Sequence, residues 1–318
     1  MNERVLFYPI LMHFAARYSG YTYGEFASDY RVLVECNLKC MDDFGMDAVG
    51  LISDPYRETS AFGADITFLA EGVPRLRNIL LTRMEDIDHL KSPDIFREER
   101  TLDRIKAGRE LRKRVDSSVP VIGWIEGPLA ESCDLAGVNE VLLKLYTEPD
   151  FIKKLIHKTM VTAKDFARAQ VEAGCEIIGV GDAICSQISA DLYRDFVKEK
   201  HMELCEYIQS LGARVKLHIC GNITHLLPEI RDVNPDMVDI DWMVDMDNAF
   251  EVLGMDIIRC GNLDPVAVIQ DRSVKEIREL TAHLCKKETG RAFILSGGCE
   301  ITVNTPVSHL KEVRDASR

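Results

Sequence analysis

Three residues in the second half of the chain have the types and positions expected of metal ligands. His218 and Cys220 stand two residues apart at the end of a short apolar run, and Cys299 follows two glycines at the end of another. In an extended segment, residues i and i+2 point the same way, so His218 and Cys220 can face one point. Two thiolates and one imidazole suit zinc, and three protein ligands leave one coordination position open for a substrate.

Carboxylates and one amide stand at or just after the ends of other runs of the same kind. Asp239 and Asp241 lie at the end of the sixth run, and either is a candidate for an exchangeable fourth zinc ligand. Asp182, Glu126 and Asn222 are candidates for orienting the ligands or contacting a substrate. Each of these three also has an ordinary interpretation, as a strand-end carboxylate or, for Asn222, as a helix N-cap. The residue types alone leave both roles open.

The elements that must position these residues follow an alternating pattern of strands and helices. Short apolar runs bounded by Gly, Asp, Asn or Pro predict parallel strands buried on both faces. Eight such strands favour a single (β/α)8 TIM barrel over residues 1–318, with its functional groups at the C-terminal ends of the strands, the mouth of the barrel. The predicted strands are Val5–Ile10, Asp47–Ile52, Val119–Ile125, Glu176–Gly181, Arg214–Ile219, Met237–Asp241, Ile257–Cys260 and Ala292–Leu295.

The connection between the second and third predicted strands is too long for one crossover. Residues 53–118 include a charged helical pattern near Arg97–Val115. We interpret this stretch as an insertion or lid over the mouth of the barrel. A surface elaboration without a role is the alternative.

Composition narrows the class of partner. The 318 residues carry a formal net charge of −13, and such a chain repels phosphate backbones and anionic membranes. We therefore predict neither a nucleic-acid nor a membrane partner. The N-terminus carries neither signal-peptide nor transmembrane features, which predicts a cytoplasmic protein. Ten cysteines in a cytoplasmic chain are expected to be thiols or metal ligands rather than disulfides.

The sequence resembles the uroporphyrinogen decarboxylase-like superfamily, and within it the zinc-dependent, corrinoid-linked methyltransferases, which include the methylcobamide:coenzyme M methyltransferases. The resemblance covers nearly the whole chain. Its most specific part is the His-x-Cys…Cys zinc motif of that group, which matches His218, Cys220 and Cys299. The other matching segments are Phe62–Ala64, Gly127–Ala130 and Gly181–Asp182.

The resemblance implies a reaction and its partners. A methyl group would pass from a methylated corrinoid, carried by a small corrinoid protein, to an acceptor that is a zinc-activated thiol such as coenzyme M, or tetrahydrofolate. A tetrapyrrole decarboxylase is one alternative, but His13 stands where the decarboxylase has an arginine, and Cys299 where it has a histidine. A zinc barrel that binds a corrinoid or tetrapyrrole without turnover is another.

Overall fold

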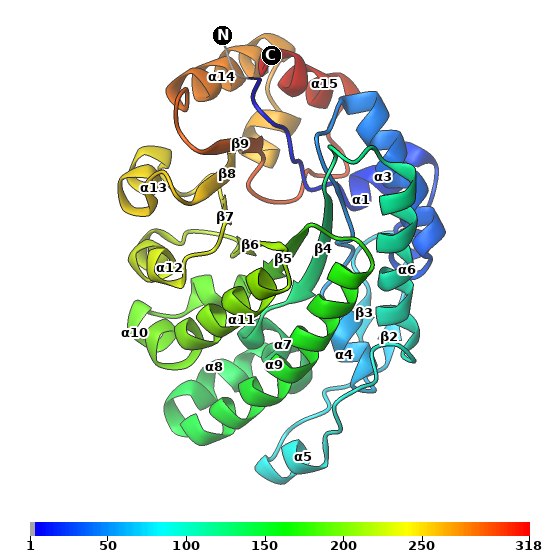
Figure 1. The fold of residues 1–318 in the computed structure, drawn as a ribbon, viewed down its shortest axis with the longest axis vertical. Helices are drawn as coiled ribbons and strands as arrows, with labels where there is room; N and C mark the ends of the chain where they lie inside the picture. The colour runs from blue at the N-terminus through cyan, green and yellow to red at the C-terminus, as the bar shows by residue number, and fades with distance from the viewer. Residues whose placement is uncertain (1–3) are drawn as a thin grey trace.

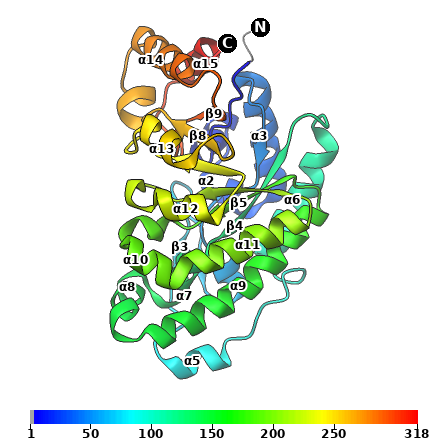
Figure 2. The ribbon, with the colours of Figure 1, turned by 60° about the vertical axis from the view of Figure 1, so that its left-hand side comes forward.

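Seven parallel strands form one curled sheet in the computed structural model, which describes residues 4–318. Helices surround the sheet on its outer side, as in a TIM barrel (Figures 1 and 2). The strands pair in the order β1-β4-β5-β6-β7-β8-β9. Their bounds are β1 Val49–Gly50, β4 Val121–Glu126, β5 Ile177–Gly181, β6 Arg214–His218, β7 Met237–Ile240, β8 Ile258–Asn262 and β9 Phe293–Ser296.

The N-terminal segment completes the barrel between β9 and β1. Two isolated parallel bridges join Phe7 to Leu295 and Ile10 to Glu300, and Asp47 on the other side donates its N–H to the carbonyl of Phe7 over 3.0 Å. The prediction of a regular strand over Val5–Ile10 is therefore wrong in detail. The segment occupies the expected position, but it forms isolated bridges in place of a continuous ladder.

The other seven predicted strands are confirmed, with ends that shift by a few residues. Strands β5 and β7 are buried along their whole length, because helices cover one face and the barrel interior covers the other. Buried strands of this kind need apolar side chains on both faces, which is why they appear in the sequence as continuous apolar runs.

Helices make the connections between successive strands. The long helix α9 runs over Pro149–Glu172, and a capping box at Ser273 and Glu276 begins α14. The α-helices are α1 His13–Ser19, α2 Tyr23–Ser28, α3 Tyr30–Phe44, α4 Arg57–Ala61, α5 Met84–His89, α6 Glu99–Arg114, α7 Pro128–Ala136, α8 Val138–Thr147, α9, α10 Ala190–Tyr193, α11 Glu199–Ser210, α12 Leu227–Val233, α13 Met246–Leu253, α14 Val274–Lys287 and α15 Val307–Ala316. Short 3-10 and π turns are η1 Ala183–Gln187, η2 Arg194–Lys198, η3 Thr224–Leu226 and η4 Pro265–Gln270.

Residues 53–118 contain α4, a two-stranded antiparallel hairpin, α5 and α6. The hairpin strands are β2 Ile66–Thr67 and β3 Arg75–Leu76. Helix α6 packs against α3, α4 and β4, so it serves as the crossover helix between β1 and β4. The remaining elements of this stretch are additional to the barrel.

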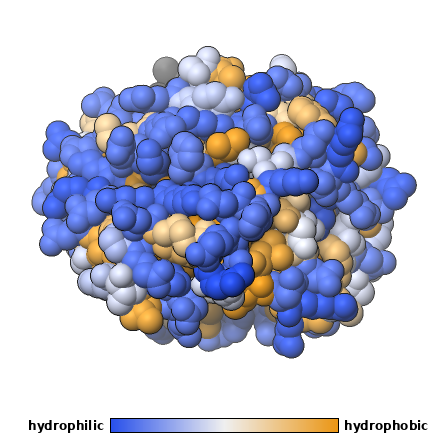
Figure 3. All heavy atoms as spheres, turned by 90° about the horizontal axis from the view of Figure 1, so that it is seen from below, coloured by the Kyte–Doolittle hydropathy of each residue, from blue (hydrophilic) through white to orange (hydrophobic). Residues whose placement is uncertain are grey.

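The surface is mostly hydrophilic, and smaller apolar areas lie between the polar side chains on the face drawn in Figure 3. Acidic residues exceed basic ones, which gives the formal net charge of −13. Within residues 4–318, no helix combines the length and the apolar character that a membrane crossing requires.

Candidate metal centre

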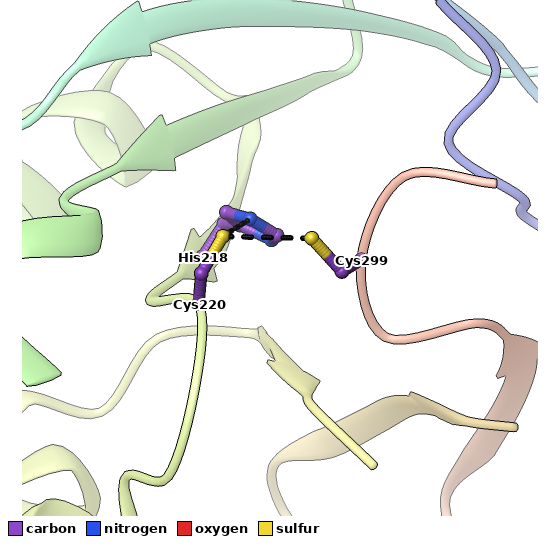
Figure 4. A group of neighbouring side chains, drawn as sticks. All are labelled: His218, Cys220 and Cys299. Carbon is purple, nitrogen blue, oxygen red and sulfur yellow. Dashed lines mark hydrogen bonds between the residues drawn. The ribbon is translucent and has the colours of Figure 1, made fainter. Parts of the chain in front are cut away.

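The three predicted metal ligands meet at the mouth of the barrel. His218 is the last residue of β6, Cys220 lies two residues beyond it, and Cys299 lies in the loop that follows β9. Their side chains point toward one another across the mouth (Figure 4). The imidazole Nε2 lies 2.8 Å from the Cys220 sulfur, and the two sulfurs are 3.7 Å apart. The donor atoms of all three lie within 4.8 Å of one another.

These separations fit a tetrahedral ion with little adjustment. Zinc–sulfur bonds of about 2.3 Å and zinc–nitrogen bonds of about 2.0 Å place ligand atoms roughly 3.5–3.8 Å apart. The two sulfurs, at 3.7 Å, already have this spacing. The His218 nitrogen and the Cys220 sulfur, at 2.8 Å, would separate by about 0.7 Å around an ion. The donor set and its spacing therefore suit zinc.

The two thiols differ in their ionisation. A hydrogen bond with Cys220, together with His218, lowers the pKa of Cys299 to about 5 although burial opposes the shift. The same hydrogen bond and burial raise the pKa of Cys220. Burial by itself would lower the pKa of His218, but its interactions with Asp239 and Cys299 raise it to about 9. A divalent cation here would displace the remaining protons, because metal ligands must be deprotonated.

Asp239 lies behind His218. Its Oδ2 atom is 2.8 Å from the Nδ1 atom of His218 and also accepts a hydrogen bond from the Nζ atom of Lys216. Burial opposes ionisation, but Lys216 and His218 lower the pKa of Asp239. The carboxylate therefore orients the ring so that Nε2 faces the two thiols, as acidic partners of metal-bound histidines do. Among residues 4–318, the group of donor atoms around His218 contains neither Asp239 nor Asp241.

Asp241 holds the loop that carries Cys220. Its Oδ2 atom accepts the backbone N–H of Gly221 over 2.9 Å, and its buried Oδ1 atom has no hydrogen-bond partner among the described residues. Gly298 packs on the same strand end, where a Cβ atom would lie 2.2 Å from the carbonyl oxygen of Ile240. The glycine before Cys299 thus lets its loop approach β7 closely. Asp239 also has a buried Oδ1 atom without a partner, so both carboxylates remain candidates for a fourth ligand, and Asp241 is the one whose side chain does not contact His218.

Replacing Asp239 with asparagine tests the support of His218. We expect zinc affinity to fall by about 10–100-fold, because the amide cannot hold the ring through an ionised acceptor. Competition with a chromophoric chelator measures the affinity. Asp195→Asn, on an exposed turn, is the control. Unchanged zinc affinity in Asp239→Asn would contradict the supporting role.

Asp182 is buried and its oxygens are already used. They accept the backbone N–H groups of Leu129 and Ala130 at the start of α7, and Oδ2 lies 2.9 Å from the Nε2 atom of His201. A Cβ atom on Gly127 would lie 2.4 Å from that of Asp182, so the glycine makes room for the carboxylate. Asp182, Cys185 and His201 form a second compact group of donor atoms, and the hydrogen bonds of Asp182 tie this group to the N-terminus of α7.

Asn222 forms a local turn. It is exposed, and its Oδ1 atom accepts the N–H of Thr224 over 3.0 Å at the start of η3. The N-cap residue of η3 is Ile223, so Asn222 forms a turn just before the helix and is not its N-cap.

Glu126, at the end of β4, belongs to a group that we call the carboxylate cluster, which consists of Glu58, Glu126, Glu131 and Asp134. The Oε1 atom of Glu126 accepts a hydrogen bond from Arg57 over 2.8 Å, and the backbone N–H of Glu126 donates to the carboxylate of Glu58 over 2.9 Å. Burial and mutual repulsion raise the pKa values of all four carboxyls, and Arg57 partly opposes this for Glu58, Glu126 and Asp134. One guanidinium thus offsets three of the four acids, and Glu131 receives no such contribution.

The sequence interpretation missed most of these supporting residues. Lys216 is a charged residue inside an apolar run, and a buried charge needs a partner, so its position was a usable signal. Glu58 and Glu131 carried no comparable signal, because an acidic residue in a helical pattern usually faces solvent.

The carboxylate cluster makes stability depend on pH. The raised pKa of Glu131 means that the folded state binds a proton more tightly than the unfolded state, where a glutamate has a pKa of about 4.3. Its contribution to stability is therefore full below that value and is lost as pH rises. We expect Glu131→Gln to reduce the decline in the free energy of unfolding between pH 5 and pH 8, measured by urea denaturation. The exposed Glu140→Gln should leave the decline unchanged, and parallel curves for Glu131→Gln and the parent would contradict the assignment.

The fold and the strand-end site define a TIM-barrel protein with a candidate metal centre at its mouth. Residues 2–318 match the family model described as uroporphyrinogen decarboxylase (URO-D). The chain therefore belongs to the uroporphyrinogen decarboxylase family.

Proteins similar in sequence to this chain are named either as decarboxylases or as methyltransferases. A uroporphyrinogen decarboxylase of Sorangium cellulosum is 27% identical over 93% of this chain and 84% of its own. The methylcobamide:CoM methyltransferase MtbA of Methanosarcina acetivorans is 25% identical over 86% of this chain and 80% of its own. The sequence similarity therefore includes both decarboxylases and a methyltransferase.

Solved structures support the fold. A methyltransferase from Methanosarcina mazei superposes with a TM-score of 0.89 at 21% identity, over 99% of this chain and 94% of that one. A B12-independent methionine synthase from Shewanella sp. W3-18-1 gives a TM-score of 0.60 at 14% identity, over 91% and 86% of the two chains. At these identities the likeness establishes the fold alone.

Proposed function

We propose that this chain is a zinc-dependent methyltransferase that moves a methyl group from a methylated corrinoid to an acceptor thiol. The observation that carries the proposal is the convergence of His218, Cys220 and Cys299 at the mouth of the barrel, with the two sulfurs 3.7 Å apart. The relative named methylcobamide:CoM methyltransferase supports the reaction class. Asp241 is the candidate for an exchangeable fourth ligand, and Asp239 holds His218.

Each part of the centre has a task in this reaction. Zinc, when bound, would supply Lewis acidity that holds the acceptor sulfur as a thiolate at neutral pH. Cys220 and Cys299 contribute negative charge that keeps this sulfur nucleophilic. Lys216 and Asp239 fix the ring of His218. Trp124 packs edge-on against that ring with centroids 5.4 Å apart, and excludes water from its inner side.

The transfer balances without an external oxidant or reductant. A sulfur lone pair forms the new sulfur–carbon bond while the cobalt–carbon bond breaks, and both electrons of that bond stay on cobalt. The thiol proton leaves to solvent. A thiol acceptor suits this centre better than tetrahydrofolate, because a nitrogen nucleophile would need a different activation.

The methyl donor would reach the centre from outside the barrel. Trp242 and Met243 follow Asp241 directly, and their exposed fractions are 47% and 49%. They place apolar side chains in the loop that follows β7, at the C-terminal end of the strands. A small corrinoid protein docked there could present its cobalt to the acceptor sulfur.

Metal content and methyl transfer test the proposal together. Protein purified without chelators should contain about one zinc per chain, and it should demethylate methylcobalamin in the presence of a thiol, followed by the change in corrinoid absorbance. Absence of both zinc and transfer would overturn the proposal, and a tetrapyrrole decarboxylase would then be the leading alternative. Decarboxylation of uroporphyrinogen by metal-free protein would establish that alternative.

A further inference from the structure

The carboxylate cluster has more acid than its protein partners can neutralise. Arg57 is fully buried and contacts Glu126 at 2.8 Å and Glu58 at 3.7 Å. The neighbouring Asp54 is neutralised by Arg100, with an oxygen–nitrogen distance of 2.7 Å. Glu131 and Asp134 therefore have no cation of their own among the described residues. Such an excess of buried charge is costly, and it is relieved either by protonation, which the raised pKa values favour, or by a further positive group.

Two buried acceptor atoms in the cluster, Oε2 of Glu58 and Oε1 of Glu131, have no hydrogen-bond partner within residues 4–318, and only the first has a cation, Arg57, nearby. Glu131 is 2% exposed, and its Oε2 atom accepts a hydrogen bond from Thr59 over 3.1 Å. Asp134, which is half-buried, also takes part in no hydrogen bond or ion pair that the described residues provide. Buried acceptors such as Oε1 of Glu131 are normally satisfied, so this carboxyl is positioned for a donor from outside the chain, and Asp134 adds negative charge near it.

The register of the sheet places this cluster on the same side as the metal centre. Glu126 on β4 pairs with Gly181 on β5, and Gly181 pairs with His218 on β6. Register partners in parallel strands point to the same face, so Glu126 and His218 both face the barrel interior. Two strand spacings separate their backbones, roughly 10 Å.

Trp124 forms the surface between the two groups. A Cβ atom on Gly179 would lie 2.3 Å from the indole, and one on Gly181 would lie 3.0 Å from it. The ring therefore lies over two residues that have no side chain and reaches His218 on the next strand. The indole thus lies on the side of the sheet that His218 and Glu126 share.

We propose that the carboxylate cluster binds a protonated amino group of the acceptor, so that the acceptor is an aminothiol. This inference rests on the proposed methyl transfer to a thiol at the metal centre. An ammonium group supplies the donors that Glu131 and Asp134 lack, and it offsets the excess negative charge. A sulfonate or carboxylate in the same place would meet acids instead of cations. Arg57 at the cluster and Lys216 behind the metal centre are already paired with Glu126 and Asp239.

Three thiols of equal chain length test whether the terminal charge of the acceptor, and not its shape, determines binding. Cysteamine, 2-mercaptoethanol and 2-mercaptoethanesulfonate carry an ammonium, a hydroxyl and a sulfonate on the same two-carbon thiol. Their binding to the protein loaded with cobalt(II) can be measured from the sulfur-to-cobalt charge-transfer absorbance, which does not depend on turnover. We expect cysteamine to bind at least about tenfold more tightly than mercaptoethanol, the effect of one charge-assisted hydrogen bond, and the sulfonate to bind most weakly.

Variants that replace a carboxyl by an amide test whether the carboxylate cluster causes the preference for cysteamine. Asp134→Asn and Glu131→Gln should each reduce the cysteamine preference by about tenfold and leave mercaptoethanol binding unchanged. Glu140→Gln, on an exposed part of α8, is the matched control and should retain the preference. Glu131 is buried and Asp134 is half-buried, so if one of these variants fails to fold, the other still tests the preference.

The outcomes separate this inference from the proposed function. Equal binding of the three thiols, tighter binding of the sulfonate, or a cysteamine preference that survives both variants would overturn the aminothiol assignment and leave thiol methylation standing. Failure of every thiol to change the cobalt spectrum or to accept a methyl group would overturn both.

Discussion

Replacing Cys299 with serine is expected to remove zinc and methyl transfer together. A serine hydroxyl is a poor zinc ligand at neutral pH, and the remaining pair of His218 and Cys220 is too small a set to hold the ion. Loss of a supporting contact costs about 10–100-fold in metal affinity, so loss of a ligand should cost more than about 100-fold. Elemental analysis and corrinoid absorbance measure the two effects. Cys220→Ser should behave in the same way.

A matched control separates metal binding from general damage to a thiol-rich core. Cys285, on α14, is partly exposed like Cys299, but burial raises its pKa to about 11 and it lies outside the group of donor atoms. Cys285→Ser should retain zinc and activity. Full methyl transfer by zinc-free Cys299→Ser protein would refute the proposed mechanism, because the centre would then be dispensable.

Asp182→Ala is expected to destabilise the fold by about 3–5 kcal/mol. The substitution leaves His201 without its buried partner and removes the acceptors for two backbone N–H groups at the start of α7. Each donor left unsatisfied in the interior costs about 1–3 kcal/mol. Urea denaturation followed by circular dichroism measures the free energy of unfolding.

The same variant tests whether Asp182 has a role in the reaction. Its carboxylate contacts α7 and His201 and makes no hydrogen bond to His218, Cys220 or Cys299, so Asp182→Ala protein that remains folded should still bind zinc. Asp195→Ala, on the exposed face of η2, should change stability by less than about 0.5 kcal/mol. A variant with parental stability and no activity would show that Asp182 acts on the substrate and not through the fold.

Local patterns of apolar and capping residues in the sequence were enough to predict most of the fold. A strand covered on both faces must be apolar at nearly every position, so β4 to β9 are legible as short apolar runs. The capping box at Ser273 is equally local, because its hydrogen bonds join residues three apart. The N-terminal segment was the exception. An apolar run shows that Val5–Ile10 is buried, but it does not show whether a neighbouring strand matches its register, and here only two bridges form.

The ligand types of the candidate site were also legible in the sequence. The spacing of His218 and Cys220 places them on one side of an extended segment, and the Gly-Gly-Cys sequence indicates a tight loop before Cys299. The distances between the three ligands could not be predicted from the sequence. Cys299 is separated from Cys220 by 79 residues and meets it only through the curvature of the sheet.

Tertiary structure alone decided the roles of the acidic residues. Asp239 and Asp241 are two residues apart and looked equivalent, yet one holds His218 with Lys216 and the other holds the backbone of Gly221. Glu126 ends one buried strand and Asp182 follows the next, but only Glu126 joins the carboxylate cluster. That cluster draws on α4, β4 and α7, and the charge and hydration of a carboxyl depend on every element packed around it. The sequence by itself thus determined which residues can bind a metal, and the packing determined which of them meet and what environment they share.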